Sequence, residues 1–508
     1  MSLDLQKGLD LLIALLPETI LSVWAMGLLL LSAWTHRDPR ALRRIGWLSL
    51  IGIGLAFVAV AWLWASHVRL EGLPTSVAVD GFRWAVDAII LIGAALAVLL
   101  SIDYLDREGI RIPEYYVLVL FAAVGMMLLA GGEDLFVLFL GLELMSVSSY
   151  VLAGIDRRRA ESAEAALKYF LLGAFASAFL LYGIAMVYGA TGSTKLGFIG
   201  FQIQTMQLTT HPMLLAGLAL LLVGFGFKVA AVPFHMWTPD VYDGSPTPVT
   251  AYFAASTKAA AFAALIRVLL RAVPLLHTTW SPVVWWMAAA TMVVGNLVAL
   301  SQKSLKRMLA YSSIAHAGYL LTALVSGSVG GAAAFLYYLL FYTLMTMGAF
   351  AVLIYKGRDG ERTVTADDLA GLAETHPWLA LLMTIFLLSL LGFPGTAGFI
   401  GKWYILASAI GAGYGLLATI MVLASVVSAG YYLPVIMAMY MKPRLYAEVH
   451  ADVSVPRVMR GVLAAVGVAL IVFGLWPSRL LDTARTGARG FLPNEIVPIS
   501  EGMPPAPR

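Results

Sequence analysis

The stretch PMLLAGLALLLVGFGFKVAAVPFHMWTPDVYDGSPTPV, from Pro212 to Val249, joins an apolar run of membrane-spanning length to a lysine and several prolines. A spanning helix needs about 20 mostly apolar residues. Lys228 lies inside the run, and Pro233 follows it five residues later. Broken helices at membrane depth occur only where the freed backbone groups are buried in protein or line a cavity. The stretch therefore predicts a spanning helix that breaks beside a buried cation.

Similar apolar runs fill most of the chain. Of the 508 residues, 60% are hydrophobic and 12% are charged, against about 25% charged in a typical soluble domain. We expect an all-α polytopic membrane protein with about fourteen transmembrane helices. The expected helices lie near residues 11–33, 44–66, 83–102, 114–130, 134–154, 166–189, 212–232, 248–272, 283–300, 307–326, 331–355, 377–410, 414–441 and 458–476.

Composition and motifs also exclude several functions. A net charge of +4 is too small to indicate the basic surface that nucleic-acid binding requires. With no cysteine, the chain has no disulfide, no thiolate metal site and no cysteine-ligated iron–sulfur cluster. The sequence has no HExxH motif, P-loop or strand-borne GxGxxG motif, so we expect no metal and no nucleotide cofactor in this chain.

Loop charges predict the orientation. Loops after odd-numbered helices hold nineteen Lys and Arg residues, whereas loops after even-numbered helices hold four. Cytoplasmic loops carry the excess of positive charge, so both termini are expected on the periplasmic side of a bacterial inner membrane.

A short motif recurs within the chain. Gly224 to Lys228 and Gly398 to Lys402 share the pattern GFxxK at an offset of 174 residues. The offset equals five helices, an odd number, so two copies would be inverted across the membrane. We expect broken helices 7 and 12 and four regions: helices 1–3 (1–112), a repeat of helices 4–8 (113–275), an inverted repeat of helices 9–13 (276–442), and helix 14 with a polar tail (443–508). The alternative is chance recurrence in a Gly- and Phe-rich chain.

Lysines inside helices are the strongest functional candidates. Each costs about 2.5 to 3.5 kcal/mol at the centre of a spanning helix, and such groups by default mark functional sites. Lys228 and Lys402 lie beside helix breakers, the second after Pro394 and Gly395, and small residues flank Lys258. A buried lysine near a carboxylate can take up and release a proton. The alternatives are lysines that snorkel to the headgroups or, for Lys258, a structural bond to a carbonyl oxygen.

Other polar residues complete the candidate relay. Glu143 is the clearest acidic residue deep in a helix and is expected to pair with a lysine, whereas Asp87 is expected at the membrane interface. Lys168 follows Glu164 by four residues, so an ordinary pair on the helix surface is an alternative. His235 and His316 lie at interior positions, where a histidine either relays protons or is simply hydrogen-bonded.

Five segments resemble the antiporter-like membrane subunits of respiratory complex I, the proton-pumping NADH:quinone oxidoreductase. The resemblance is closest to the N-type subunit, favoured by the surroundings of Glu143 and by lysine at position 402. The segments are LFLGLELMSVSSYVLAG (138–154), EAALKYFLLGAFASAFLLYG (164–183), GFGFKVAAVPFHMWTPDVYDGSPTPV (224–249), GNLVALSQKSLKRMLAYSSIAHAGYLL (295–321) and GFPGTAGFIGKWYIL (392–406).

This resemblance implies a role for each candidate. Glu143 and Lys228 would belong to one half-channel, Lys258 would bridge to the centre, and Lys402 would belong to a second half-channel. Lys168, His235 and His316 would lie on the polar axis between them. The implied partners are M-type antiporter-like subunits, small K-, J- and A-type membrane subunits, and a peripheral arm that holds flavin mononucleotide and iron–sulfur clusters, with quinone also bound outside this chain.

Two other functions remain open at this point. A subunit of a multisubunit sodium/proton antiporter or of a membrane-bound hydrogenase would share the superfamily motifs, and sodium-dependent activity without an electron donor would identify the antiporter. A self-sufficient organic-solute carrier would take up substrate when reconstituted alone.

Overall fold

The computed structural model describes residues 5–35, 38, 40–66, 76–357, 363–443 and 455–491. Five of the cations that enter the orientation count lie outside these ranges: Arg37, Arg69, Arg358, Arg362 and Arg444. The end of the expected polar tail, residues 492–508, lies outside them as well.

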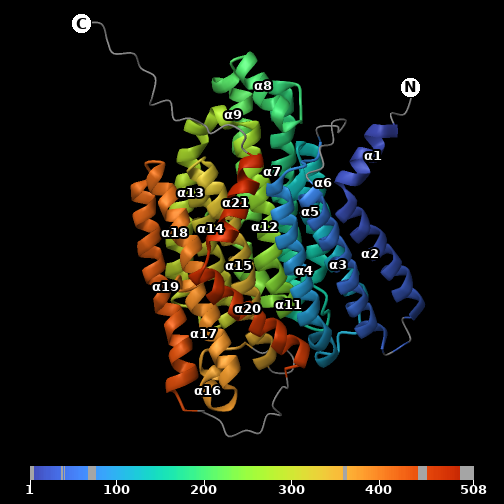
Figure 1. The fold of residues 1–508 in the computed structure, drawn as a ribbon, viewed down its shortest axis with the longest axis vertical. Coiled ribbons are helices and arrows are strands. Elements are labelled where there is room, and N and C mark those ends of the chain that lie inside the picture. The colour runs from blue at the N-terminus through green and yellow to red at the C-terminus, as the bar shows by residue number, and fades with distance from the viewer. Residues whose placement is uncertain are drawn as a thin grey trace.

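The described chain is built from helices, in the order shown in Figure 1. They are α1 (Leu5–Ala14), α2 (Leu16–Thr35), α3 (Ala41–Ser66), α4 (Gly81–Arg107), α5 (Glu114–Gly131), α6 (Leu135–Ala153), α7 (Ala160–Thr191), α8 (Leu196–Thr205), α9 (Pro212–Lys228), α10 (Trp237–Gly244), α11 (Thr247–Tyr252), α12 (Lys258–Arg267), α13 (His277–Ala299), α14 (Leu305–Val325), α15 (Val329–Lys356), α16 (Leu372–Thr375), α17 (Pro377–Leu391), α18 (Ala397–Gly411), α19 (Gly415–Met441), α20 (Arg457–Leu475) and α21 (Ser478–Phe491).

The all-helical membrane class expected from the sequence is confirmed. Within the described ranges, twelve helical segments are long and apolar enough to cross a membrane, and two shorter apolar helices, α9 and α17, accompany them. Each of the fourteen expected runs overlaps a helix, while the number that crosses the bilayer stays a prediction. Figure 1 shows α8 at one end of the bundle and α16 at the other, as expected for helices that run back and forth.

Two expected helices are interrupted near their polar residues. The seventh run ends as a helix at Lys228, and the chain resumes helical structure only at Trp237. The twelfth run divides into α17 and α18 around Pro394, where Gly392 and Gly395 adopt positive φ angles of 87° and 89°. Glycine takes this left-handed conformation without the strain that a Cβ atom would impose.

The segment Thr247–Ala272 forms the centre of the bundle and is buried throughout its most apolar stretch. It is not one regular α-helix, because π-helical turns at Phe253–Thr257 and Val268–Ala272 flank α12. Such π turns often mark functional sites. Lys258 is the first residue after one of them.

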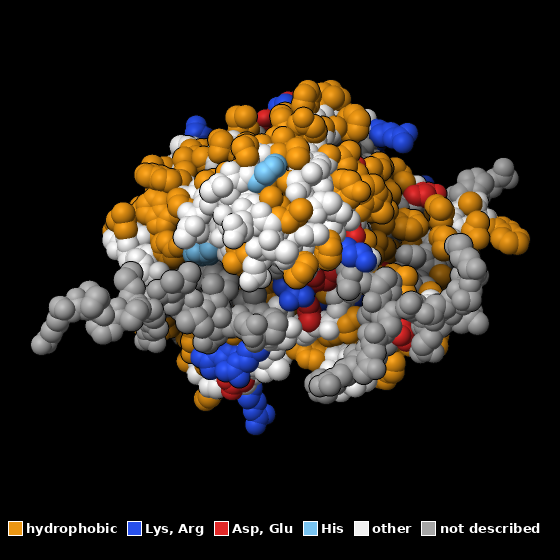
Figure 2. All heavy atoms as spheres, turned by 90° about the horizontal axis from the view of Figure 1, so that it is seen from above, with side chains coloured by type: hydrophobic (Ala, Val, Ile, Leu, Met, Phe, Trp, Pro, Cys, Tyr) orange, Lys and Arg blue, Asp and Glu red, His pale blue; other side chains and the backbone are white. Residues whose placement is uncertain are grey.

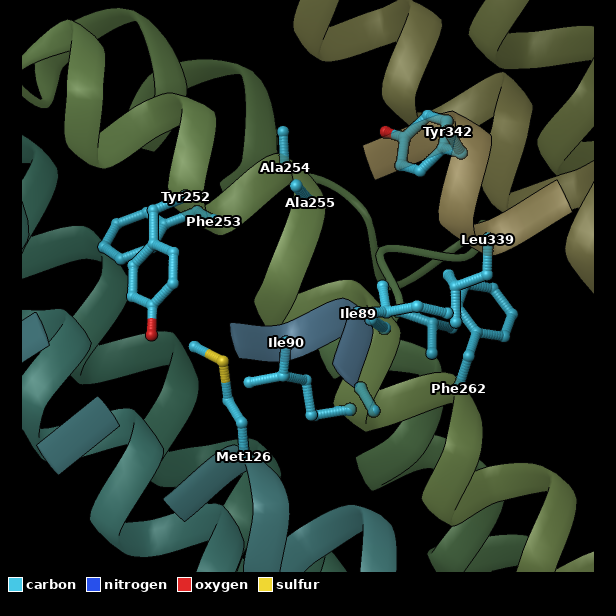
Figure 3. Close-up of a cluster of buried hydrophobic side chains, with 14 of the residues drawn as sticks. Ile89, Ile90, Met126, Tyr252, Phe253, Ala254, Ala255, Phe262, Leu339 and Tyr342 are labelled. Atoms are coloured by element: carbon cyan, nitrogen blue, oxygen red, sulfur yellow. The ribbon is translucent and has the colours of Figure 1, made fainter. Parts of the chain in front are cut away.

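Close packing around the centre depends on small residues. A Cβ atom at Gly125 of α5 would lie 2.3 Å from the backbone nitrogen of Met145 in α6, so the two helices touch backbone to backbone. Figure 3 shows the apolar centre, where Ile89 of α4 lies near Phe262 and Leu339. These side chains fill the space between helices from distant parts of the sequence.

The carboxyl-terminal tail contains a helix that was not expected. Helix α21 packs on α4 and α15 with Leu481, Ala484, Ala488 and Phe491 inward, and the ring of Phe491 stacks on Phe82 at 4.8 Å. A spacing of three or four residues between apolar positions is typical of an amphipathic helix. That spacing could have predicted α21 despite the glycines and arginines of the tail.

Candidate functional site

Lys228 lies at the end of α9, buried among helices α6 and α7. Its side chain is 4% exposed, and Nζ donates a hydrogen bond to Ser146 Oγ at 2.7 Å. The hydroxyl of Tyr150 lies 3.5 Å from the same Nζ, and the rings of Tyr150 and Tyr169 lie 5.5 and 5.7 Å away. This ammonium is held by neutral polar and aromatic groups, which allow it to exist with or without its proton.

The expected ion pair between Glu143 and Lys228 is absent as a direct contact. Glu143 is partly buried on α6, its Oε1 accepts no hydrogen bond, and no ion pair joins it to Lys228 among the described residues. Ser146, three residues after Glu143, takes the position next to the ammonium. The rotation of α6 about its axis is the reason, because the side chain of Ser146 faces Lys228 more directly than the side chain of Glu143 does.

Lys258 joins α12 to α14 at the centre of the protein. Its side chain is 1% exposed, and Nζ donates to the backbone oxygen of Ser313 at 2.6 Å and to Ser313 Oγ at 2.5 Å. The hydroxyl of Tyr342 donates to the same Oγ at 2.7 Å. The carbonyl bond expected for a structural lysine is present together with a hydroxyl bond that can carry a proton onward.

His316 lies one turn along α14 from Ser313 in a ring of tyrosines. It is 1% exposed; Tyr338 lies with its hydroxyl 2.6 Å from Nδ1, and the hydroxyl of Tyr432 lies 3.4 Å from Nε2. The rings of Tyr319 and Tyr342 are both 5.2 Å from the imidazole. Hydroxyl groups can both donate and accept, so this arrangement can pass a proton through the imidazole.

Lys402 lies at the break between α17 and α18. Its side chain is 7% exposed, and Nζ donates to the backbone oxygens of Leu390 and Leu391 at 2.9 and 3.0 Å. These carbonyl groups belong to the last turn of α17, which has no following helical turn to satisfy them. The ring of Tyr319 lies 4.5 Å from Nζ and connects Lys402 to the surroundings of His316.

Lys168 lies apart from these buried residues. Its side chain is 40% exposed, and Nζ contacts Glu164 Oε1 and Asp240 Oδ2, both at 2.7 Å. Burial alone would raise the pKa of Asp240, but hydrogen bonds from Lys168 and Arg307 outweigh it and lower that pKa. The geometry includes the surface pair with Glu164 that was one alternative for Lys168, whereas its part in proton transfer stays a prediction.

This ion cluster lines a hollow of about 610 Å³. Its walls come from α7, α10, α14 and the segment before α16, and its charged lining residues are Arg159, Glu161, Glu164, Lys168, Asp240, Asp243, Lys306 and Arg307. Positive and negative groups are equal in number there, so the hollow suits water and protons better than an anion. Its lining includes Thr363, from the segment that leads to α16.

His235 lies in the break that follows α9. It is partly buried, and its Nδ1 has no hydrogen-bond partner. Its neighbours Pro233 and Met236 are exposed, so the break reaches the surface of this chain. The structure therefore brings Lys258, His316 and Lys402 together and places Lys168 and His235 nearer the surface.

Tyrosines that the sequence analysis did not single out connect the charged groups. Tyr150 and Tyr169 lie beside Lys228, while Tyr319, Tyr338, Tyr342 and Tyr432 surround His316. A tyrosine in an apolar run carries no charge and fits a purely hydrophobic interpretation. Tyr169 follows Lys168 in α7, Tyr150 shares α6 with Glu143 and Tyr319 shares α14 with His316, whereas the helices of Tyr338, Tyr342 and Tyr432 hold no candidate residue.

No group of three or more His, Asp or Glu residues lies in the described ranges with the geometry of a metal site. What the arrangement can do is hold and move protons. It has ionisable nitrogens at four buried residues, Lys228, Lys258, His316 and Lys402, and hydroxyl groups lie between Lys258 and His316.

A family model described as "NADH:quinone oxidoreductase/Mrp antiporter, TM" matches residues 132–428, from just before α6 into α19. A protein of Gemmatimonas aurantiaca named "NADH-quinone oxidoreductase subunit N" is 49% identical over 487 residues, covering 93% of this chain and 92% of its own length. A protein of the same name from Trichlorobacter lovleyi is 47% identical, covering 94% of this chain and 96% of its own length.

Solved structures agree with this similarity. A chain in "Respiratory complex I from Thermus thermophilus with bound Aureothin" is 40% identical, with a TM-score of 0.77, covering 93% of this chain and all of its own. A chain of an archaeal membrane-bound sulfane sulfur reductase is 25% identical, with a TM-score of 0.81 and coverage of 93% and 98%. The same fold therefore occurs in more than one membrane respiratory assembly.

Proposed function

We propose, on the premise that the chain belongs to the NADH-quinone oxidoreductase subunit N family, that its buried residues move protons across the membrane. As a member of that family it is a multi-pass membrane subunit of complex I. The reaction that drives it is quinone reduction in neighbouring subunits. This chain acts as a non-redox subunit without a catalytic site of its own, in keeping with its lack of cysteine.

The observation that carries this proposal is the polar connection inside the apolar centre. Lys258 binds Ser313, Ser313 accepts from Tyr342, and Tyr342 lies against the ring of His316. Tyr319 continues from that ring to Lys402. Buried ionisable groups are expensive in a membrane protein and mark ion or proton pathways.

The other candidates extend this route. Lys228 with Ser146 and Tyr150 forms the first half, and Glu143 acts there through water or through Ser146 and not through a direct ion pair. The hollow around Lys168 is one entrance to the proton route. His235 lies beside the first helix break and takes part in the same route.

Sidedness and internal symmetry follow from the loop charges and the recurring motif. The end that holds the hollow faces the cytoplasm of a bacterium, and both termini lie on the periplasmic side. Residues 113–275 and 276–442 form two inverted repeats, supported by a helix break beside each GFxxK lysine.

The partners follow from the family. They are M-type antiporter-like subunits, small K-, J- and A-type membrane subunits, and a peripheral arm, all within complex I. Flavin mononucleotide, iron–sulfur clusters and quinone belong to those partners.

The test compares Lys258→Ala with Lys303→Ala in the assembled complex. Lys303 is exposed beyond the end of α13 and serves as the matched lysine control. With assembly verified, Lys258→Ala should lower the number of protons moved per NADH oxidised, and Lys303→Ala should leave it unchanged. A normal ratio in the Lys258→Ala complex would contradict a route through Lys258.

A further inference from the structure

A second group of buried charges lies where α2, α4 and α12 meet. Arg83 Nη2 contacts Glu18 Oε1 at 2.6 Å, and Arg267 Nη1 contacts Asp80 Oδ2 at 2.8 Å and Glu133 Oε1 at 2.6 Å. Both guanidinium groups are completely buried. Ion pairs this deep need nearly complete compensation, because each desolvated charge costs several kcal/mol.

This arginine cluster lies at the opposite end of the bundle from the Lys168 hollow. Glu133 precedes α6, whereas Arg159 of the hollow follows it, so the two groups lie at opposite ends of that helix. Figure 2 shows the α8 end of the molecule from above, with charged side chains scattered among apolar and uncharged groups. The cluster is therefore a candidate for the second end of a transmembrane route.

Asp87 is the unusual member of the cluster. Expected at the membrane interface, it is completely buried, because Arg83 on the preceding turn and Glu18 of α2 enclose it. Its Oδ2 lies 3.3 Å from Arg83 Nε, yet neither carboxylate oxygen accepts a hydrogen bond. A buried carboxylate without a hydrogen-bond donor is the group most easily neutralised by a proton.

Charge counting leads to the same residue. The cluster holds four carboxyl groups and three guanidinium groups, so one proton on a carboxyl group makes it neutral. Glu18, Asp80 and Glu133 all accept close bonds from arginine, which leaves Asp87 as the place for that proton. The members counted are Glu18, Asp80, Asp87 and Glu133 with Arg83, Arg267 and Arg271.

Three buried hydroxyl groups lie close in sequence to Lys258 and Tyr342 of the buried centre. Ser256, Thr343 and Thr346 are buried, and the hydroxyl groups of Ser256 and Thr343 have no hydrogen-bond partner. Ser256 precedes Lys258 by two residues, and the two threonines follow Tyr342 on α15. Polar groups of this kind are normally satisfied by internal water, which conducts protons.

Two of these hydroxyl groups converge on α4. A Cβ atom built on Gly93 would lie 2.0 Å from Ser256 Oγ and 3.5 Å from Thr343 Cγ2, so both side chains reach the backbone of that helix. Gly93 is six residues, or about 9 Å along the helix axis, from Asp87. The surroundings are apolar, as the side chains of Ile89 and Ile90 in Figure 3 illustrate.

We propose that Asp87 is the terminal proton-binding residue of the route, exchanging protons with the Lys258 centre past Ser256 and Thr343 and with the surface at the end of the bundle where the arginine cluster lies. This inference rests on the proposed function. One proton moves onto a carboxylate oxygen of Asp87 and leaves from the same group, so no other reactant is required.

The test uses Asp87→Asn and Asp87→Glu in the assembled complex, with protons moved per NADH oxidised and melting temperature as readouts. Asparagine is neutral and nearly isosteric with protonated aspartate, so the complex should assemble and melt normally while proton pumping is lost in part. Glutamate should restore the ratio. A normal ratio in the Asp87→Asn complex, or its failure to assemble, would identify Asp87 as structural and overturn the proposal.

Variants that lack a single hydroxyl group test the connection between Asp87 and the Lys258 centre separately. Ser256→Ala should lower the ratio, whereas Ser101→Ala should not, because Ser101 is buried on α4 but already bonded to Ala97 and Tyr115. An unchanged ratio in Ser256→Ala would contradict the connection. If Lys258→Ala lowers pumping and Asp87→Asn does not, only this inference fails; if neither does, the proposed function fails too.

Discussion

Lys258 and Ser313 are joined twice, because the ammonium of Lys258 donates to both the backbone oxygen and the hydroxyl oxygen of Ser313, at 2.6 and 2.5 Å. Lys258 begins α12 and Ser313 lies in α14, so this contact connects the two regions proposed as repeats. The carbonyl bond positions the lysine. The hydroxyl bond continues to Tyr342 and gives a proton a way onward.

Removing only the hydrogen bond to the Ser313 hydroxyl group should therefore slow proton transfer and leave Lys258 in place. We expect Ser313→Ala to lower proton pumping per NADH while the complex assembles normally, since the carbonyl bond remains. Thr322→Ala is the control, because Thr322 is also buried on α14 but bonds only to the carbonyl of Gly318 on its own helix. Equal pumping by the two variants would show that the Ser313 hydroxyl carries no proton.

The break beside Lys402 should depend on its glycines. Gly395 has a φ angle of 89°, and a Cβ atom there would meet nothing within 4 Å, so any effect of Gly395→Ala comes from backbone strain of roughly 1 to 2 kcal/mol. We expect a lower melting temperature of the complex. Gly411→Ala, equally free of neighbours and without a positive φ angle, should not lower it.

An equal effect of the two alanines would contradict the backbone geometry assigned to the break. A larger loss in Gly395→Ala supports a break held open by glycine, with the carbonyl groups of Leu390 and Leu391 available to Lys402.

Charged residues within apolar runs could be predicted from sequence because nothing else explains their cost. Lys228, Lys258 and Lys402 all lie buried where the runs placed them. The contacts could not be predicted in the same way. Whether Ser146 or Glu143 reaches Lys228 depends on the rotation of α6 about its axis, which only packing against its neighbours determines.

Asp87 shows a related limit of prediction from sequence. Its position near the start of a helix suggested the membrane interface, yet a residue near a helix end can still be enclosed by other helices. Arg83 and Arg267 each have a partner more than sixty positions away in the sequence, Glu18 and Glu133 respectively. No local pattern reports contacts of that kind.

Orientation can be examined with single cysteines, since the chain has none of its own. Arg158 and Ser328 are both exposed and lie at opposite ends of the bundle, Arg158 donating to the carbonyl group of Glu108 and Ser328 capping α15. Arg158→Cys should react with an impermeant thiol reagent only from the cytoplasmic side, and Ser328→Cys only from the periplasmic side. Labelling of both from one side would contradict the inverted arrangement, and reversed labelling would contradict the charge-based orientation.

Lys228→Arg in the assembled complex tests the central claim most directly. Arginine keeps a positive charge at the end of α9, but a guanidinium group does not release its proton at any accessible pH, so charge is preserved while exchange is lost. The measurement is protons moved per NADH oxidised, with assembly and melting temperature confirmed first. The account predicts a ratio well below that of the unmodified complex; a normal ratio would show that Lys228 holds charge for structural reasons and does not carry protons.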